Sequence, residues 1–62
     1  MCESTAYYVS KDGTEKIMEN VICVIPQSDG IFLEDILGEQ ITAKGTISEI
    51  KLLDHKILIK KA

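Results

Sequence analysis

Turn-forming residues interrupt this chain at short intervals, which favours short strands over long helices. Asp12-Gly13 and Asp29-Gly30 both suit hairpin turns, because these residues tolerate the positive φ angles that such turns require. Gly38, Lys44-Gly45 and Asp54-His55 mark three further breaks. The segments between the breaks are rich in β-branched and aromatic residues, as strands are. The spacing therefore predicts an all-β protein.

The pattern predicts one domain, residues 1–62, with five strands at residues 5–9, 21–26, 31–37, 46–53 and 56–60. Pro26 ends the second strand because it cannot donate a ladder hydrogen bond. Lys16–Asn20 could hold one helical turn, and Glu39–Ala43 is expected to be a connecting piece. Five short antiparallel strands with tight turns indicate a small SH3-like barrel.

The apolar residues exceed what one small core needs. A core facing the barrel interior can be built from Val9, Ile17, Val21, Cys23, Ile25, Ile31, Leu33, Ile36, Ile47, Ile50, Leu52, Ile57 and Ile59. This leaves for the opposite face Ile22, Val24, Phe32, Leu58, Tyr7 and Tyr8. Exposed apolar surface on so small a domain often marks an interface, so we expect a homodimer.

The charge balance argues against a nucleic-acid partner. Seven lysines and no arginine stand against ten acidic residues, giving a net charge of −3. A nucleic-acid-binding protein normally presents a basic face, and arginine is the residue best suited to bidentate phosphate contacts. The one local excess of lysine, at Lys56, Lys60 and Lys61, is explained by a solvated strand face and tail.

The cysteine count and the hydropathy pattern are those expected of a cytoplasmic protein. Cys2 and Cys23 could form at most one bridge, too few for a secreted disulfide scaffold. No signal segment opens the chain, and the longest apolar run, Val21–Pro26, is far too short to span a bilayer. We therefore expect reduced thiols and no membrane partner.

Catalytic motifs are absent, and the protein is not expected to be an enzyme. The sequence has no HExxH, CxxC, P-loop or GxGxxG spacing. His55 lies in a turn, where a solvated role is expected. Glu34 and Asp35 are neighbours on a strand, so they point to opposite faces and are interpreted as a solvated edge. Cys23, inside the run VICVIP, is interpreted as core packing.

Cys2 is the exception, because several metal donors lie within a few bonds of its thiol. The Met1 amine, the Cys2 amide nitrogen and the Cys2 sulfur would close five-membered chelate rings; without Met1, the Cys2 amine and thiolate still form one. Planar nitrogen and sulfur donors suit Ni(II) or Cu(II). Two termini meeting at a dimer axis could supply four donors to one metal. Chemistry alone still favours the simpler interpretation, a strand-end thiol without a ligand.

The order of four segments along the chain favours a metal-ligand role for Cys2 over a thiol without a ligand. MCESTAYYV, KDG, MENVICVIPQSDGIFLEDILGE and GTISEIKLLDHKILI follow one another over essentially the full length. In this arrangement the chain resembles the CooT family, accessory proteins linked to nickel insertion into carbon monoxide dehydrogenase. The resemblance implies an SH3-like homodimer with Cys2 as the nickel ligand.

The function implied by the resemblance is binding of Ni(II), one ion per homodimer, and service as a nickel chaperone. Carbon monoxide dehydrogenase or its maturation proteins would then be the partner. The alternative is a small β-barrel that docks on a protein through its apolar face, with no metal role. Replacement of Cys2 distinguishes the two hypotheses.

Overall fold

The computed structural model describes residues 3–62, which contain six strands and no helix. The strands are β1 (Ser4–Ser10), β2 (Gly13–Gln27), β3 (Gly30–Asp35), β4 (Gln40–Ala43), β5 (Gly45–Lys51) and β6 (Lys56–Lys61). The all-β prediction is confirmed, but the count of five strands is wrong. Residues 40–43, expected to be a connecting piece, pair with β3 as β4, and residues 16–20, expected to hold a helical turn, lie within β2.

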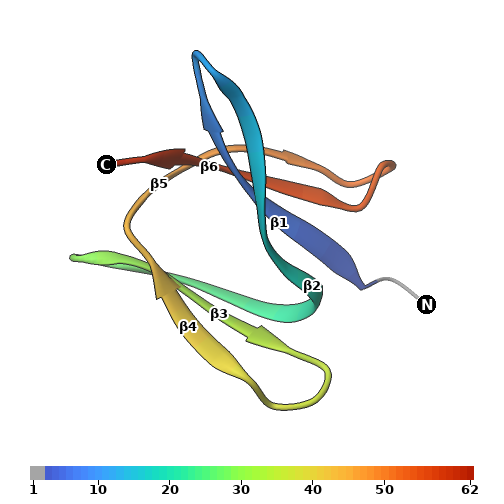
Figure 1. Ribbon diagram of the computed structural model, residues 1–62. Helices are drawn as coiled ribbons and strands as arrows, with labels where there is room; N and C mark the ends of the chain where they lie inside the picture. The colour runs from blue at the N-terminus through green and yellow to red at the C-terminus, as the bar shows by residue number, and fades with distance from the viewer. Residues whose placement is uncertain (1–2) are drawn as a thin grey trace.

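The six strands form one sheet in the order β4-β3-β2-β1-β6-β5. The long strand β2 belongs to both halves of the sheet. Its residues up to Val21 pair with β1, and those from Val21 onward pair with β3. Between the halves Asn20 has a φ of 56°, a left-handed value that asparagine adopts more readily than most residues. The sheet curls around this bend into a half-barrel with β4 and β5 at its edges (Figure 1).

One pair of strands runs parallel, which corrects the expectation of an antiparallel sheet throughout. Thr5 of β1 lies opposite Lys56 of β6, and Val9 lies opposite Lys60. A parallel pair cannot be joined by a tight turn and needs a long crossover. The crossover here consists of the four strands from β2 to β5, because β1 and β6 are the first and last strands of the chain.

The core lies inside the curl and contains Ala6, Met18, Val21, Ile31, Leu33, Ala43, Ile57 and Ile59. Five of these eight were predicted, and Ala6, Met18 and Ala43 were not. Ile17 and Ile47 pack against the core as expected, and so do Tyr8 and Val24, which were predicted on the opposite face. Alternation turns Val9, the neighbour of Tyr8, and Cys23, the neighbour of Val24, away from the core, and both are half-buried. Cys23 does not share the inward face of Val21 because the register of β2 shifts between these two residues.

Four predicted core residues are exposed instead: Ile25, Ile36, Ile50 and Leu52. Ile25 follows the inward-facing Val24, so the strand period turns it outward. Ile36 and Leu52 lie just beyond the ends of β3 and β5, where the chain turns. Ile50 belongs to the edge strand β5, which has a neighbour on one side.

Within residues 3–62 there is also no helix with the length and hydrophobicity needed to cross a membrane.

Candidate metal centre

The two predicted metal ligands, Met1 and Cys2, lie outside the described residues. The first strand begins two residues after Cys2, at Ser4. Ser4 pairs with Val21 on β2, and the main-chain N–H of Thr5 donates a hydrogen bond to the carbonyl oxygen of His55 (2.9 Å). The start of β1 is therefore held between the bend of β2 and the β5–β6 turn (Figure 1).

The bend of β2 is in turn tied to the β3–β4 turn. The Ile36 N–H donates to the carbonyl oxygen of Asn20 (2.9 Å). Oδ1 of Asp35 accepts hydrogen bonds from the N–H groups of Leu37 and Glu39, both at 2.9 Å. The Gly38 N–H donates to the Asp35 carbonyl oxygen (3.0 Å), so this turn is closed by both the side chain and the main chain of Asp35.

Asp35 is buried, with 9% of its surface exposed, and the interpretation of this residue as part of a solvated edge is wrong. Its carboxylate takes the place of a main-chain acceptor in the turn, as aspartate often does two residues before a turn amide. A signal for this role was present in the sequence, because Asp35 comes three residues before the strand-breaking Gly38.

Exposed apolar side chains gather on the segments that surround the start of β1. Among residues 3–62, six of the seven large exposed hydrophobic residues belong to these segments: Ile22, Ile36, Leu37, Ile50, Leu52 and Leu53. We call these six residues the apolar end. Leu37, in the β3–β4 turn, and Leu53, in the β5–β6 turn, are the most exposed of the six, with 83% and 94% of their surface exposed. Apolar surface of this kind on a small domain is typical of a contact with another molecule.

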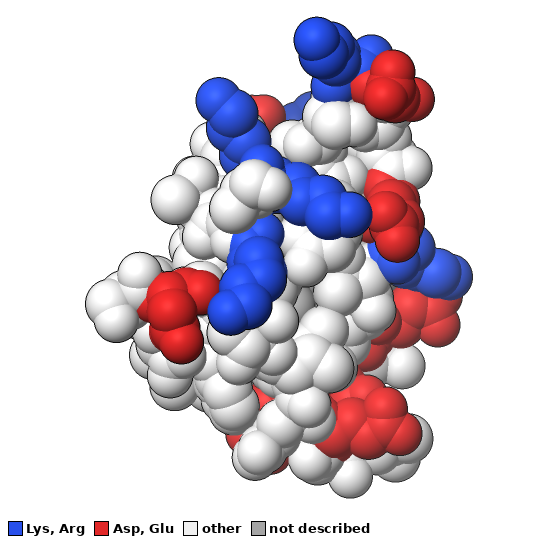
Figure 2. Space-filling model, turned by 60° about the vertical axis from the view of Figure 1, so that its left-hand side comes forward, with Lys and Arg blue, Asp and Glu red and all other residues white. Residues whose placement is uncertain are grey.

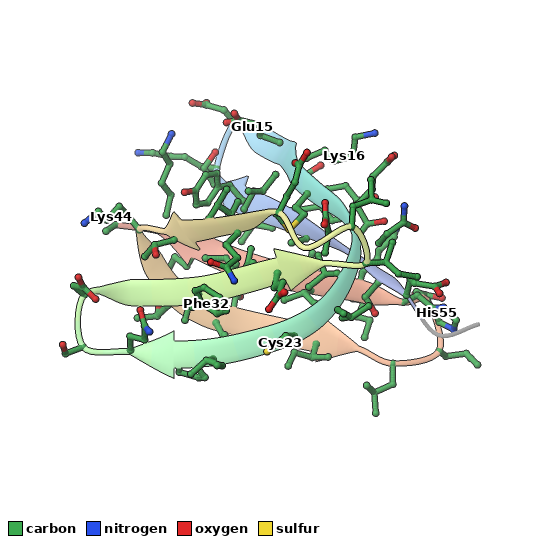
Figure 3. All side chains as sticks on the ribbon, turned by 90° about the horizontal axis from the view of Figure 1, so that it is seen from below. Glu15, Lys16, Cys23, Phe32, Lys44 and His55 are labelled. Atoms are coloured by element: carbon green, nitrogen blue, oxygen red, sulfur yellow. The ribbon has the colours of Figure 1, made fainter. Side chains whose placement is uncertain are left out.

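Other potential metal donors are scattered over the described part of the chain. Cys23 lies on β2 opposite Glu34, and His55 lies exposed in the β5–β6 turn (Figure 3). The solvated role predicted for His55 fits this exposure, whereas Cys23 is half-buried and lies outside the buried core. Among residues 3–62, no three His, Cys, Asp or Glu side chains lie close enough to hold a metal ion.

An open groove of about 410 Å³ borders the bend of β2. Its walls carry the apolar side chains of Ile17, Met18, Leu37 and Ile41 and the carboxylates of Glu19, Asp35 and Glu39. Asp35 is already occupied by its two turn amides. Glu19 accepts a 2.6 Å hydrogen bond from Lys16 Nζ, which lowers the pKa of Glu19 and raises the pKa of Lys16.

Comparison with known proteins identifies the family. The family model for the CO dehydrogenase accessory protein CooT matches residues 1–60. A crystal structure of CooT from Carboxydothermus hydrogenoformans superposes with a TM-score of 0.91 at 36% sequence identity, covering 98% of each chain. An uncharacterized protein from Methanothermobacter thermautotrophicus is 38% identical over 60 residues, or 97% of this chain and 89% of that protein. The resemblance predicted from the four sequence segments is confirmed.

Proposed function

This chain belongs to the CooT family of CO dehydrogenase accessory proteins, an accessory family and not a catalytic one, and from that membership we propose that it binds Ni(II) as cargo. The site is built on Cys2 and shared by two subunits of an SH3-like homodimer. The protein delivers this nickel, in the cytoplasm, to the maturation of carbon monoxide dehydrogenase. The observation that carries the proposal is the family match, which begins at residue 1 and includes Cys2.

The donor chemistry of the first two residues supports a nickel site. The Met1 amine, the Cys2 amide nitrogen and the Cys2 thiolate can chelate one metal through five-membered rings, and loss of Met1 would leave the Cys2 amine and thiolate. Nitrogen and thiolate donors in one plane suit a square-planar Ni(II) ion, whereas Zn²⁺ prefers a tetrahedron. One terminus supplies two or three donors, so a second terminus is needed to complete four.

The apolar end supports the sharing of the site between two subunits. Its side chains surround the start of β1, where the described chain comes within one residue of Cys2. If two copies bury these side chains against each other, their first residues come together at the same contact. Dimerisation and nickel binding would thus use one end of the molecule.

The alternative function is a protein-interaction module in which the apolar end docks on a partner and Cys2 has no metal role. Both functions use the apolar end, so exposure of these residues does not distinguish them. They differ in what happens to added nickel and in whether the thiol at position 2 matters.

The test is a nickel titration of the reduced protein followed by ultraviolet–visible absorption. Cys2→Ser removes the proposed ligand, and Cys23→Ser is the matched control because it removes the other thiol of the chain. We expect thiolate-to-nickel charge-transfer bands that saturate at one Ni(II) per two chains in the parent protein and in Cys23→Ser. Cys2→Ser should lack these bands and should keep the fold and the dimer.

Other outcomes favour different conclusions. Charge-transfer bands that vanish in Cys23→Ser and persist in Cys2→Ser would show that Cys23, and not Cys2, is the nickel ligand. Featureless titrations of all three proteins would leave the interaction module as the function. A parallel Cu(II) titration is informative because Cu(II) generally binds such donors more tightly, so selectivity for nickel in the cell would depend on metal availability.

A further inference from the structure

The groove beside the bend of β2 lies between two strand edges that no strand of residues 3–62 covers. The part of β2 before Val21 pairs with β1 on one side, whereas β3 pairs with the part from Val21 onward. β4 pairs with β3 and is an edge of the sheet. The groove is lined by residues 16–20 of β2 and by residues of the β3–β4 turn and β4, so it opens between these two edges. An open strand edge offers main-chain groups that can pair with another extended chain.

Gln40 and Thr42 direct main-chain groups to the open edge of β4. The Asp35 N–H donates to the Glu39 carbonyl oxygen (3.0 Å), so these two residues form a hydrogen-bonded pair. Such pairs alternate along antiparallel strands, so the N–H and C=O groups of Gln40 and Thr42 point away from β3. Lys44, the next residue in this series, bonds away from β3 through both of its main-chain groups, as the alternation requires.

The side chains of Asp35 and Glu39 give the groove its negative charge. The two residues lie opposite each other, so their side chains leave the same face of the sheet as the core residue Leu33, two positions before Asp35. Oδ1 of Asp35 accepts both turn amides, and no group of residues 3–62 donates to Oδ2. Since no buried side-chain oxygen among these residues lacks a partner, Oδ2 is open to solvent. Asp35 is 9% exposed and lines the groove, so Oδ2 is a fixed acceptor there.

The described part of the chain does not neutralise these two carboxylates. Lys16 and Glu19 also line the groove, but they form an ion pair with each other, and it is the one side-chain ion pair within residues 3–62. On the face that Figure 2 shows, the lower part, at the level of the β3–β4 turn in Figure 1, carries acidic and uncharged side chains and no visible lysine. The groove therefore favours a positively charged occupant.

Apolar side chains suit the rest of such an occupant. Ile17 and Met18 of β2, Leu37 of the β3–β4 turn and Ile41 of β4 line the groove, whose volume is about 410 Å³. A lysine side chain packs its methylene groups on apolar surface while its ammonium group reaches a carboxylate. Asp35 offers one open oxygen, so the paired contacts of an arginine fork have less to bind than the single charge of a lysine.

We propose that this groove binds a short extended segment of a partner protein that carries a lysine. The segment adds to the edge of β4 through the main-chain groups of Gln40 and Thr42, and its ammonium group pairs with Asp35 and Glu39. In this binding mode the main-chain hydrogen bonds give affinity and the side-chain pocket gives specificity. The site shares Leu37 with the apolar end, whereas its polar groups lie outside the apolar end. The proposal goes beyond nickel binding and does not depend on it.

The experiment is an NMR titration of ¹⁵N-labelled full-length protein with the capped peptide Thr-Val-Lys-Val-Thr, and peptides with Gln or Glu in place of the lysine are the comparisons. Glu39→Gln removes one carboxylate of the site. Glu34→Gln is its matched control, because Glu34 is the strand neighbour of Asp35 and points to the opposite face. Thr42→Pro removes an N–H from the open edge, and Thr42→Val keeps it. No nickel is present, so failure of the nickel proposal leaves this result unaffected.

We expect the lysine peptide to shift the amide resonances of Gln40, Thr42 and the β3–β4 turn. The Gln peptide should bind about tenfold more weakly, because hydrogen bonds between charged groups are stronger than neutral ones. Glu39→Gln should weaken binding of the lysine peptide about threefold and Thr42→Pro about fivefold. Glu34→Gln and Thr42→Val should bind it as the parent does.

Several results would overturn the proposal. Equal weakening in Glu39→Gln and Glu34→Gln would show a dependence on net charge alone. Equal binding of the three peptides, or no binding of the lysine peptide, would show that the groove does not select a lysine. Peptide-induced shifts confined to the β5–β6 turn would place the peptide at the apolar end. If the same β4 amides shifted with protein concentration in the absence of peptide, the occupant would be a second copy of this chain.

Discussion

The main-chain N–H of Thr5 donates a hydrogen bond to the carbonyl oxygen of His55 (2.9 Å), which fixes the β5–β6 turn beside the start of β1. His55 has a φ of 56°, and its own N–H donates to the Leu52 carbonyl oxygen (3.3 Å) to close the turn. Leu52 and Leu53, exposed in this turn, are thereby held near the segment that follows Cys2. A contact made by these leucines would bring the N-termini of two copies close together.

Replacing both leucines should dissociate the proposed dimer without unfolding the subunit. Burial of a leucine side chain contributes about 1.5–3 kcal/mol, so Leu52→Gln/Leu53→Gln should raise the dimer dissociation constant at least about 100-fold. The fold should persist because both side chains are exposed in the single chain, at 81% and 94%. Sedimentation over a range of protein concentrations measures the change.

Ile25→Gln is the control for this pair. Ile25 is also exposed, but it lies on β2 beyond the bend, toward the β2–β3 turn, and is not part of the apolar end. This variant should keep the dissociation constant of the parent. If Ile25→Gln dissociated the dimer and the leucine variant did not, the interface would lie on the outer face of β2 and β3.

Asp35→Ala should destabilise the domain by about 1–3 kcal/mol, the usual cost of leaving partly buried polar groups without a partner. The variant removes the acceptor for the Leu37 and Glu39 amides, both of which donate to Oδ1 at 2.9 Å. Asp35→Asn keeps an oxygen at the same position and should lose less. Urea unfolding measures both changes, and equal losses would show that these two hydrogen bonds are not the main contribution of Asp35.

Gly45→Ala should be more destabilising than Gly13→Ala by about 1–3 kcal/mol, the cost of inserting an atom into a filled space. Both glycines have positive φ angles, 149° and 122°, so alanine is strained at either position. A Cβ at Gly45 would also clash with the carbonyl oxygen of Lys60, whereas nothing lies within 4 Å of a Cβ at Gly13. Thermal unfolding compares the stability of the two variants. Similar losses of stability would show that the β4–β5 corner can shift away from β6 to make room for the added methyl group.

Glu19 should titrate at a lower pH than an ordinary glutamate. The hydrogen bond from Lys16 and the attraction of its positive charge both favour the ionised carboxylate and lower the pKa of Glu19. Lys16→Gln should return the pKa of Glu19 toward its usual value. An NMR titration of the Glu19 side-chain carboxyl measures this change. An unchanged pKa of Glu19 in the variant would mean that the ion pair is not formed in solution.

The sequence determined the fold class and most turn positions, because these depend on neighbouring residues. Asp12-Gly13 and Asp29-Gly30 lie at turns as predicted, since the positive φ angles that glycine permits are a local property, although the strand that follows Gly13 begins well before the predicted residue 21. Period-two alternation correctly identified Ile57 and Ile59 as core residues on one face of β6. The four sequence segments that resemble the CooT family also come from the amino-acid sequence alone, and they identified the family correctly.

Tertiary structure decided which strands are neighbours and which apolar residues are covered. The parallel pairing of Thr5 with Lys56 joins residues from opposite ends of the chain, and no local pattern encodes it. Ile36 and Leu52 are of the same residue types as the core residues, yet they lie in turns just beyond the ends of β3 and β5 and are exposed. The contact of Lys61 with Tyr8 likewise exists because β6 runs beside β1. Hydrophobicity sets how strongly a residue favours burial, but the packing of distant strands sets whether there is a surface to bury it against.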